Sequence, residues 1–401
     1  MADNNENKVL NVPHLRFPEF SGEWNKYTIN DLATVVGGGT PDTTVKSYWG
    51  GDIQWFTPSE IGKNKYVDFS KRTITRDGLD NSSAKLLPLH TILLSSRATV
   101  GECSIASNEC TTNQGFQSLI AKQCNIDFLY YLIQTKKKDL IRNACGSTFL
   151  EISANEIRKI KVAVPVQNEQ EQIAKLLSLI DERIATQNKI IEKLQSLIKG
   201  IMVELQKRGL SNGTWKKVLL SNVLTERNEL NKSLYPVYSV SVIQGIVNQM
   251  EYLGRSFAAS DTSKYHVVHY GDLVYTKSPT GSFPYGIIKQ SYNQNEVAVS
   301  PLYGVYEPKT FSTGVFLHEY FKSELNTLNY LHPLVQKGAK NTINIANQRF
   351  LESYVAIPSN ANELLAISKL LCSLNTKLEF LQNILKQSQG QKQYLLRQMF
   401  I

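Results

Sequence analysis

The sequence predicts an α+β protein with two globular domains in tandem repeat, separated by two long antiparallel coiled-coil helices. Three observations predict this fold. Segments of the first half return in the second half in the same order, a heptad pattern of apolar residues closes each half, and short apolar runs broken by turn signals precede each heptad pattern. The 401 residues are enough for two or three domains. We predict an N-terminal segment at 1–23, globular domains at 24–165 and 211–358, and spacer helices at 166–210 and 359–401.

The repeat is read from three matched segments. Gly22-Glu-Trp24 returns as Gly213-Thr-Trp215, 191 residues later. Val162-Ala-Val-Pro165 returns as Val355-Ala-Ile-Pro358 after 193 residues, and 175–181 returns as 369–375 after 194. Three matches in the same order with nearly constant offsets indicate an internal duplication.

Each half ends in a stretch with the spacing of a coiled-coil helix. Acidic Glu169 and Glu171 stand near the start of the first stretch, and Lys207-Arg208 followed by Gly209 mark its end, as the helix dipole favours. Each stretch covers about 40 residues, or roughly 60 Å of helix. Neither apolar stripe is stable in water alone, and the nearest partner for each is the other. The predicted helix-pairing residues are Ile173, Leu177, Ile180, Ile184, Ile191, Leu194, Ile367, Leu371, Leu374, Leu378, Leu381 and Leu385.

The stretches before the helices read as short strands with some helix. Apolar runs such as 53–56, 91–94 and 273–275 are short and bounded by turn residues, and 128–133 and 316–328 have helical character. Outside the framing segments the two domains barely match in sequence. A repeated framework with different interiors is what we expect of two related domains that recognise two different targets.

The charge balance favours an anionic partner. Lysine and arginine number 44 against 35 aspartate and glutamate, a net charge of +9, although ordinary surface charge is the alternative. Lysine and arginine neutralise phosphates, and asparagine and glutamine can pair with adenine. The candidate DNA-binding residues are Lys63, Lys65, Lys71, Arg72, Arg76, Arg97, Asn113, Gln114, Arg255, Lys264, Lys277, Lys289, Lys337, Lys340, Asn341 and Arg349.

Motifs for catalysis are not found, so we predict no catalytic residues. Gly281 and Gly286 have the glycine spacing of a P-loop, but Ile287 stands where the lysine is needed. His266 and His269 lie in an apparent strand and would point to opposite faces, so no metal site is expected. Five cysteines without a C-x-x-C pair are expected to be reduced packing residues. With no signal peptide and no membrane span, we expect a cytoplasmic protein.

Several segments resemble the specificity subunit of type I restriction-modification systems. Residues 12–24, beginning Val-Pro-His-Leu-Arg-Phe-Pro, are similar to the family's opening. Residues 93–101 (LLSSRATVG) and 112–116 (TNQGF) resemble its recognition domains, and 165–174 and 180–184 resemble the start of its central helix. The second helix departs from this pattern, with Asn375-Thr-Lys-Leu378 in place of Asp181-Glu-Arg-Ile184, and we expect the contacts of those charges to be weaker there.

The resemblance implies a function. The two globular domains would be target-recognition domains, each reading half of a bipartite, double-stranded DNA target. The paired helices would fix the gap and dock two methyltransferase (modification) subunits, which carry S-adenosylmethionine and methylate adenine. A separate motor-nuclease (restriction) subunit would use ATP and magnesium, and this chain itself would hold no cofactor. Two alternatives stay open: a coiled-coil scaffold whose globular domains bind protein, and an enzyme whose motifs differ from the known ones.

Overall fold

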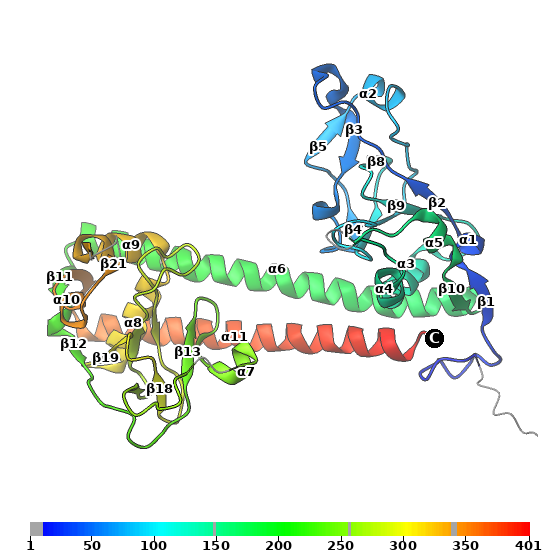
Figure 1. Cartoon of the computed structure of the whole chain (residues 1–401). Coiled ribbons are helices and arrows are strands. Elements are labelled where there is room, and N and C mark those ends of the chain that lie inside the picture. Colours follow the sequence, from blue (N-terminus) through cyan, green and yellow to red (C-terminus); the bar gives the residue numbers. More distant parts are fainter. Residues whose placement is uncertain (1–10, 147–149, 256–257, 338–342) are drawn as a thin grey trace, which may run out of the picture. The chain divides into compact units, whose positions relative to one another are not determined.

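The computed structural model describes residues 11–146, 150–255, 258–337 and 343–401 (Figure 1). The chain divides into two compact units. Unit 1 comprises the chain up to Lys189 together with Asn383–Ile401, and unit 2 comprises Ile190–Gln382. Each unit therefore contains one strand-rich globular part and a portion of each of the two long helices, α6 (Gln167–Ser211) and α11 (Ala361–Gln398).

The globular part of unit 1 is built on three small sheets. A five-stranded sheet has the order β2 (Ala33–Gly37), β9 (Gln117–Ala121), β6 (Ile92–Leu94), β7 (Cys103–Ala106), β4 (Tyr66–Val67). A three-stranded sheet has the order β5 (Arg72–Ile74), β3 (Trp49–Phe56), β8 (Cys110–Thr112), and β1 (Asn25–Thr28) pairs with β10 (Lys161–Val164). Its short helices are α1 (Ile29–Leu32), α2 (Arg76–Asp80), α3 (Ile126–Thr135), α4 (Lys137–Arg142), α5 (Ala154–Lys159) and the 3-10 turns η1 (Lys46–Tyr48) and η2 (Pro58–Glu60).

Unit 2 has a related set of elements. A four-stranded sheet has the order β12 (Leu224–Glu226), β19 (Gly304–Pro308), β16 (Leu273–Tyr275), β17 (Ile288–Gln290). Four strand pairs complete it: β11 (Trp215–Leu219) with β22 (Tyr354–Pro358), β13 (Tyr238–Ser241) with β14 (Gly245–Asn248), β15 (His266–Val268) with β18 (Val297–Val299), and β20 (Gln336–Lys337) with β21 (Ile343–Asn344). Its short helices are α7 (Gln249–Leu253), α8 (Phe311–Phe321), α9 (Glu324–Leu331), α10 (Asn347–Phe350) and the 3-10 turns η3 (Leu220–Asn222) and η4 (His332–Leu334).

The duplication extends into the interiors of the two units. The order β2-β9-β6-β7 in unit 1 matches β12-β19-β16-β17 in unit 2, and every neighbouring pair in both is antiparallel. The helix that follows this sheet begins in the same way in both units. Asn125 caps α3 and Thr310 caps α8, and each side chain accepts a hydrogen bond from the backbone N–H three residues later. The poor sequence match between the interiors therefore hides a shared sheet.

The join between each globular part and its long helix is also duplicated. The Trp24 indole N–H donates to Glu169 of α6 at 3.3 Å, and the Trp215 indole N–H donates to Glu363 of α11 at 2.8 Å. Both tryptophans are buried, and each packs edge-on against a phenylalanine of the helix that follows the shared sheet, Phe128 in the first turn of α3 and Phe316 in the middle of α8. The glutamates are 194 residues apart, the same offset as the helix repeat.

A second polar link lies about three turns further along each long helix. In unit 1 the Tyr131 hydroxyl of α3 donates to Asp181 of α6 at 2.7 Å. In unit 2 the equivalent Asn375 of α11 donates to Glu319 of α8 at 2.8 Å. The carboxylate of this link is on the long helix in unit 1 and on the short helix α8 in unit 2, so the link is present in both units with its charge on opposite partners.

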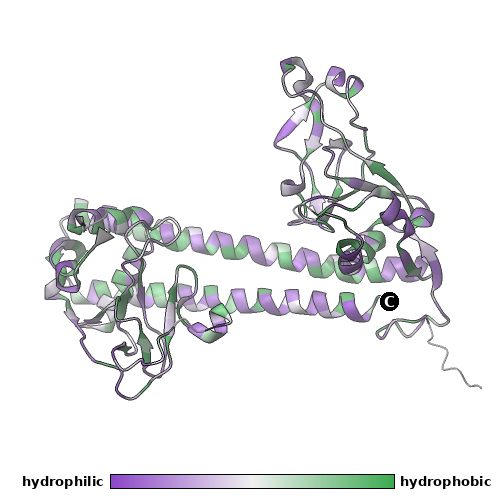
Figure 2. Ribbon diagram, viewed as in Figure 1, coloured by the Kyte–Doolittle hydropathy of each residue, from purple (hydrophilic) through white to green (hydrophobic). Residues whose placement is uncertain are grey.

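The long helices pair antiparallel within each unit. In unit 1 the early α6 residues Ile173 and Leu177 share a core with Leu395 and Leu396 at the end of α11. In unit 2 the late α6 residue Leu194 and its neighbours share a core with Ile367 and Leu371 at the start of α11. All twelve predicted stripe residues are buried or half-buried, and Figure 2 shows apolar and polar residues alternating along both helices. None of the described helices is long and apolar enough to cross a membrane.

Candidate nucleic-acid interface

A glycine loop and an amide loop meet at the surface of unit 1. Gly39 N–H donates to the Thr112 carbonyl at 2.8 Å, and the Thr40 hydroxyl donates to the side-chain oxygen of Gln114. A Cβ atom on Gly38 would lie 2.0 Å from the Asn113 carbonyl oxygen, so only glycine permits this approach. The glycines at 37–39 therefore hold the amide loop rather than a phosphate.

The two predicted amide residues are held with their nitrogens available. Asn113 N–H donates to the Phe56 carbonyl at 3.0 Å, and the Asn113 side-chain oxygen accepts from Gly115 N–H at 2.9 Å. Across the described residues, neither the Asn113 nor the Gln114 side-chain nitrogen donates a hydrogen bond. Such fixed amides can present donors to a base edge.

Buried polar atoms lie beneath the amide loop. Ser96 Oγ, Thr112 Oγ1, Gln117 Oε1 and Ser118 Oγ are buried and have no hydrogen-bond partner within the described residues. Ser96 N–H donates to the Gly115 carbonyl at 2.8 Å, which joins this group to the loop. Native structures contain few such atoms, and they mark places where a missing partner or a functional constraint is expected. Sequence patterns carried no signal for this group, because partnering is decided by the tertiary contacts.

An aromatic platform holds one of the predicted arginines. The guanidinium carbon of Arg72 lies 3.6 Å from the centroid of the Trp49 ring and 5.5 Å from that of Trp55. The Trp55 indole N–H donates to the Gly39 carbonyl at 2.9 Å. Arg72 is thereby linked through Trp55 to the glycine loop, and Thr40 of that loop bonds Gln114. The sequence analysis named Arg72 but missed both tryptophans.

A cation stands in the turn after the central strand of each main sheet. In unit 1, Arg97 pairs with Glu151 at 2.8 Å beside Ala98, whose φ is +59°. In unit 2, Lys277 itself has φ +60° after β16. A left-handed conformation is uncommon outside glycine and costs energy. Because β6 and β16 hold the same place in their sheets, the two turns are equivalent positions in the fold.

Lys277 stands beside a carboxylate and an incompletely bonded amide. Burial lowers the pKa of Lys277, and the Glu226 carboxylate opposes part of that shift. Asn347 donates to Glu226 at 2.8 Å, while its own side-chain oxygen is buried without a partner among the described residues. This half-buried polar cluster is the counterpart in unit 2 of the Arg97–Glu151 pair.

Two predicted lysines of unit 1 lie in a different place. Lys63 and Lys65 line a cleft of about 970 Å3 between the globular part and the long helices of the same unit. Lys65 pairs with Asp127 at 2.7 Å and donates to Ser178 of α6 at 2.6 Å, so its charge is used inside the unit. Three of the five lysines that line the cleft are paired with its carboxylates, so most of its positive charge is used inside the unit: Lys65 with Asp127, Lys137 with Glu102 and Lys392 with Asp181.

The remaining candidates of unit 1 are exposed at its surface. Lys71 is exposed, and its backbone N–H donates to Glu60 at 2.6 Å. Arg76 forms an i,i+4 pair with Asp80 at 3.4 Å in which both side chains are well exposed. Exposed pairs of this kind are weak, so Arg76 is available to another anion.

In unit 2 the structure removes one predicted residue. Lys289 is buried in β17, and burial lowers its pKa to about 8, with Lys322 adding repulsion and Glu319 opposing it. A buried amine cannot reach a nucleic acid, so Lys289 leaves the candidate interface. All three residues of β17 are buried, so the usual alternation of a strand between its two faces could not have predicted the burial of Lys289 from sequence.

The other candidates of unit 2 are scattered. Arg255 and Lys264 are exposed, and Arg349 is half-buried and donates to the Leu334 carbonyl at 3.0 Å. Lys337 belongs to β20, and only its backbone is described. Lys340 and Asn341 lie outside the described residues.

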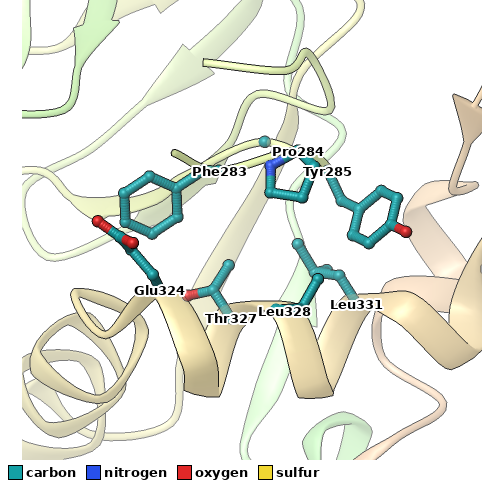
Figure 3. Close-up of a pocket in the computed structure, with 8 residues that line it drawn as sticks. Phe283, Pro284, Tyr285, Glu324, Thr327, Leu328 and Leu331 are labelled. Atoms are coloured by element: carbon teal, nitrogen blue, oxygen red, sulfur yellow. The ribbon is translucent and has the colours of Figure 1, made fainter. Parts of the chain in front are cut away.

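Unit 2 also has a small hollow between the 283–286 loop and α9, shown in Figure 3. Phe283, Pro284 and Tyr285 face Thr327 and Leu328 across it. Its space totals about 140 Å3 and leaves no room for a water molecule, so it is packing and not a ligand site.

The cysteines and acidic residues form no metal centre in the described part of the chain. All five cysteines are free, and no group of three histidine, cysteine, aspartate or glutamate side chains could hold an ion there. Burial raises the pKa of the Cys103, Cys110 and Cys124 thiols to about 12, which keeps them protonated and poor ligands.

The chain is similar to known proteins of one kind. A family model for the type I restriction modification DNA specificity domain matches residues 21–196. The type I restriction enzyme MjaIX specificity subunit of Methanocaldococcus jannaschii is 39% identical over 183 residues, which are 43% of this chain and 42% of that protein. The EcoR124I/EcoR124II specificity subunit of Escherichia coli is 29% identical over 175 residues, 42% of this chain and 43% of that protein. The matched segments thus span less than half the length of these relatives.

A solved structure resembles nearly the whole chain. The S subunit of a type I restriction-modification system from M. genitalium has a TM-score of 0.61 at 16% identity, covering 97% of this chain and 99% of that one. At this identity the similarity concerns the fold. The comparisons confirm the resemblance predicted from the sequence: residues 21–196 match the family model for the type I restriction modification DNA specificity domain, and the fold of the chain is similar to that of a type I S subunit.

Proposed function

We propose that this chain is the non-catalytic DNA-recognition subunit of a type I restriction-modification complex. Each unit reads one half of a bipartite duplex target with its globular part. The observation that carries this proposal is the duplication: two equivalent sheets, each joined to a long helix through the same tryptophan–glutamate contact, carry different polar groups on their equivalent turns.

The polar groups of unit 1 support base reading. Fixed amides at 113 and 114 and a stacked arginine are the side chains that discriminate bases, while exposed lysines supply phosphate contacts. Unit 2 offers Lys277 and Asn347 at the equivalent edge. Because the groups differ, the two half-sites differ, and the target is not a palindrome.

The partners of this proposal follow from two similar helix frameworks. Two methyltransferase subunits dock on the long helices, one per unit, and two motor-nuclease subunits join through them. S-adenosylmethionine, ATP and magnesium act on those partners, and this chain binds none of them. A complex of this kind works on genomic DNA in the cytoplasm.

A domain exchange tests the modular reading. Residues 24–165 are replaced by the corresponding domain of a different specificity subunit, and methylated adenines are mapped across a genome. We expect one half of the methylated sequence to change and the other to stay. The reciprocal exchange of 211–358 should change only the other half, and a change in both halves from either exchange would reject the proposal.

The salt dependence of binding separates DNA recognition from the scaffold alternative. Phosphate contacts make the affinity fall steeply as salt rises. We expect the chain with its modification subunits to bind duplex DNA with that dependence. No DNA binding by the assembled complex would favour a protein-binding scaffold, and methyl transfer or cleavage by this chain alone would show an enzyme.

A further inference from the structure

The starting observation is the environment of Arg72. Arg72 pairs with Trp55 across β5 and β3, its side chain is exposed, and its guanidinium carbon lies 3.6 Å from the Trp49 ring centroid. Within the part of the chain that the structure describes, no hydrogen bond or ion pair joins this guanidinium to another side chain. A cation at that distance is held over the ring face, and its five N–H donors remain unused.

The platform beneath Arg72 is rigid. The Trp49 indole N–H donates to the Asp42 carbonyl at 3.1 Å. Trp49 meets Trp55 edge-to-face, with centroids 5.0 Å apart and planes at 90°, and Trp55 is buried. Trp55 is in turn tied to Gly39. The ring under Arg72 is therefore fixed on two sides and connected to the loop that carries Gln114.

An irregularity in the pairing of β3 with β5 lies at Trp49. In the β3–β5 pairing both Trp49 and Ile53 lie opposite Ile74, so the register shifts between them. Gly50 has φ +83°, and a Cβ on Gly51 would lie 2.6 Å from the Ile74 carbonyl oxygen. Irregularities of this kind re-aim side chains and often contain glycines. Trp49 lies at this irregularity, with its ring against Arg72.

We infer that Arg72, presented on Trp49, reads a guanine in the half-site of unit 1. This inference rests on the proposed function and names one specificity-determining residue within it. A guanidinium held in one plane offers a two-pronged fork that matches the O6 and N7 acceptors of guanine in the major groove. A phosphate contact needs no such orientation, and the exposed Lys71 next to it already offers a mobile charge for that purpose.

The central test replaces the guanidinium group of Arg72 and keeps its positive charge. The full chain with its modification subunits, as wild type and as Arg72→Lys, is used to select duplexes from a random pool, and the selected sites are tested for methylation. Wild type should require guanine at one position of one half-site. Arg72→Lys should reduce that preference by about tenfold to a hundredfold, the range for one lost bidentate contact. The other half-site should stay unchanged.

Two further variants make the test specific. Arg142→Lys alters an exposed arginine of α4 in the same unit, outside the candidate interface, and it should leave the guanine preference intact. Trp49→Leu removes the platform and keeps Arg72, so it should weaken the same preference at the same position. In the double variant, Trp49→Leu should add little to the loss of guanine preference caused by Arg72→Lys, because both substitutions remove the same interaction. Thermal unfolding of each variant checks that it is folded.

The opposing outcomes are distinct. If Arg72→Lys keeps the full guanine preference, Arg72 does not read the base. If Arg72→Gln weakens binding to all sequences equally and lowers the salt slope by about one, Arg72 contacts a phosphate and the inference is wrong. If the wild-type complex selects no sequence at all, the proposed function fails first, and the inference falls with it.

Discussion

At the residue scale, a glutamate in the first turn of each long helix joins the globular part to that helix. Glu169 is fully buried and accepts from the Trp24 indole and from Arg16, at 2.7 and 2.8 Å for the two guanidinium contacts. The bond to Glu169 raises the pKa of Arg16. Glu363 in unit 2 accepts from Trp215. Both units thus share the tryptophan–glutamate contact, but within the described residues only the glutamate of unit 1 also binds an arginine.

Glu169→Gln should therefore cost more stability than Glu363→Gln. Glutamine keeps an acceptor for the tryptophan but leaves Arg16 without its counter-charge, a loss of about 1–3 kcal/mol. Glu363→Gln should cost under about 1 kcal/mol. Urea unfolding followed by tryptophan fluorescence measures both. Equal losses in the two variants would mean that the arginine pair adds nothing.

The buried amine of Lys289 should make the stability of the chain depend on pH. Its folded pKa of about 8 lies below the ordinary 10.5, so between these values the unfolded chain binds more protons than the folded one. Stability contributed by this residue therefore rises with pH through that window. Below pH 8 the buried cation costs about 3 kcal/mol.

Lys289→Met removes that cost. The variant should be more stable than wild type at pH 7, by up to about 3 kcal/mol, and the difference should shrink as the pH approaches 10.5. Lys264→Met, at an exposed position, is the control for loss of a positive charge. Denaturant unfolding of unit 2 at pH 7, 8.5 and 10 gives the comparison, and a pH-independent difference would contradict it.

At the element scale, two glycines interrupt the long helices without a structural need. Gly200 in α6 and Gly390 in α11 have open space where a Cβ atom would stand. Glycine in a helix interior is less stable than alanine by about 0.5–1 kcal/mol. Gly200→Ala and Gly390→Ala should each stabilise the chain by that amount, as denaturant unfolding would show. Destabilisation would mean that a bend at these points is required.

In the glycine loop of unit 1, substitution by alanine should destabilise the chain at one of two neighbouring glycines. A Cβ on Gly37 would make an ordinary 3.6 Å contact with Gln117, whereas a Cβ on Gly38 would collide with the Asn113 backbone at 2.0 Å. Gly38→Ala should cost about 1–3 kcal/mol and displace the amide loop, while Gly37→Ala should change little. DNA affinity and thermal unfolding of the two variants test this. If both lose affinity alike, the steric explanation is wrong.

At the scale of the whole molecule, unit 1 is completed by residues far away in the chain. Phe400 stacks on Phe128 at 5.2 Å and meets Trp24 edge-on at 6.3 Å, inside the core that also contains Ile173 and Leu177. The Lys136 ammonium donates to the Ile401 carbonyl at 2.7 Å. The core of unit 1 therefore closes only after unit 2 has been synthesised, which makes its folding depend on long-range contacts.

Phe400→Ala should destabilise unit 1 by about 3–5 kcal/mol, the usual cost of emptying a buried phenylalanine site. Hydrogen exchange should report lost protection in α3, with α8 of unit 2 unchanged. Phe380→Ala removes a phenylalanine of α11 that is 63% exposed, and it should leave both regions protected. Loss of protection in α8 as well would show that the two units unfold together.

Much of the fold was accessible from sequence because it rests on repetition and period. The offset between Trp24 and Trp215 and the apolar spacing from Ile173 onward are chemical patterns within short windows of sequence. The twelve stripe positions are buried or half-buried. The shared sheet order was not accessible, since backbone hydrogen bonds carry it and side chains as different as Ser104 and Lys289 stand at the equivalent position beside its central strand.

The site divides in the same way. Composition and residue type pointed to Arg72, Asn113, Gln114 and Lys277, because donors and cations are visible in sequence. Only the tertiary structure placed Arg72 on Trp49, buried Lys289 and tied the glycine loop to Gln114. The sequence by itself thus determined the duplication, the paired helices and the kinds of polar group, since each depends on local pattern. The tertiary structure decided which of those groups meet, because burial and orientation come from contacts between residues distant along the chain.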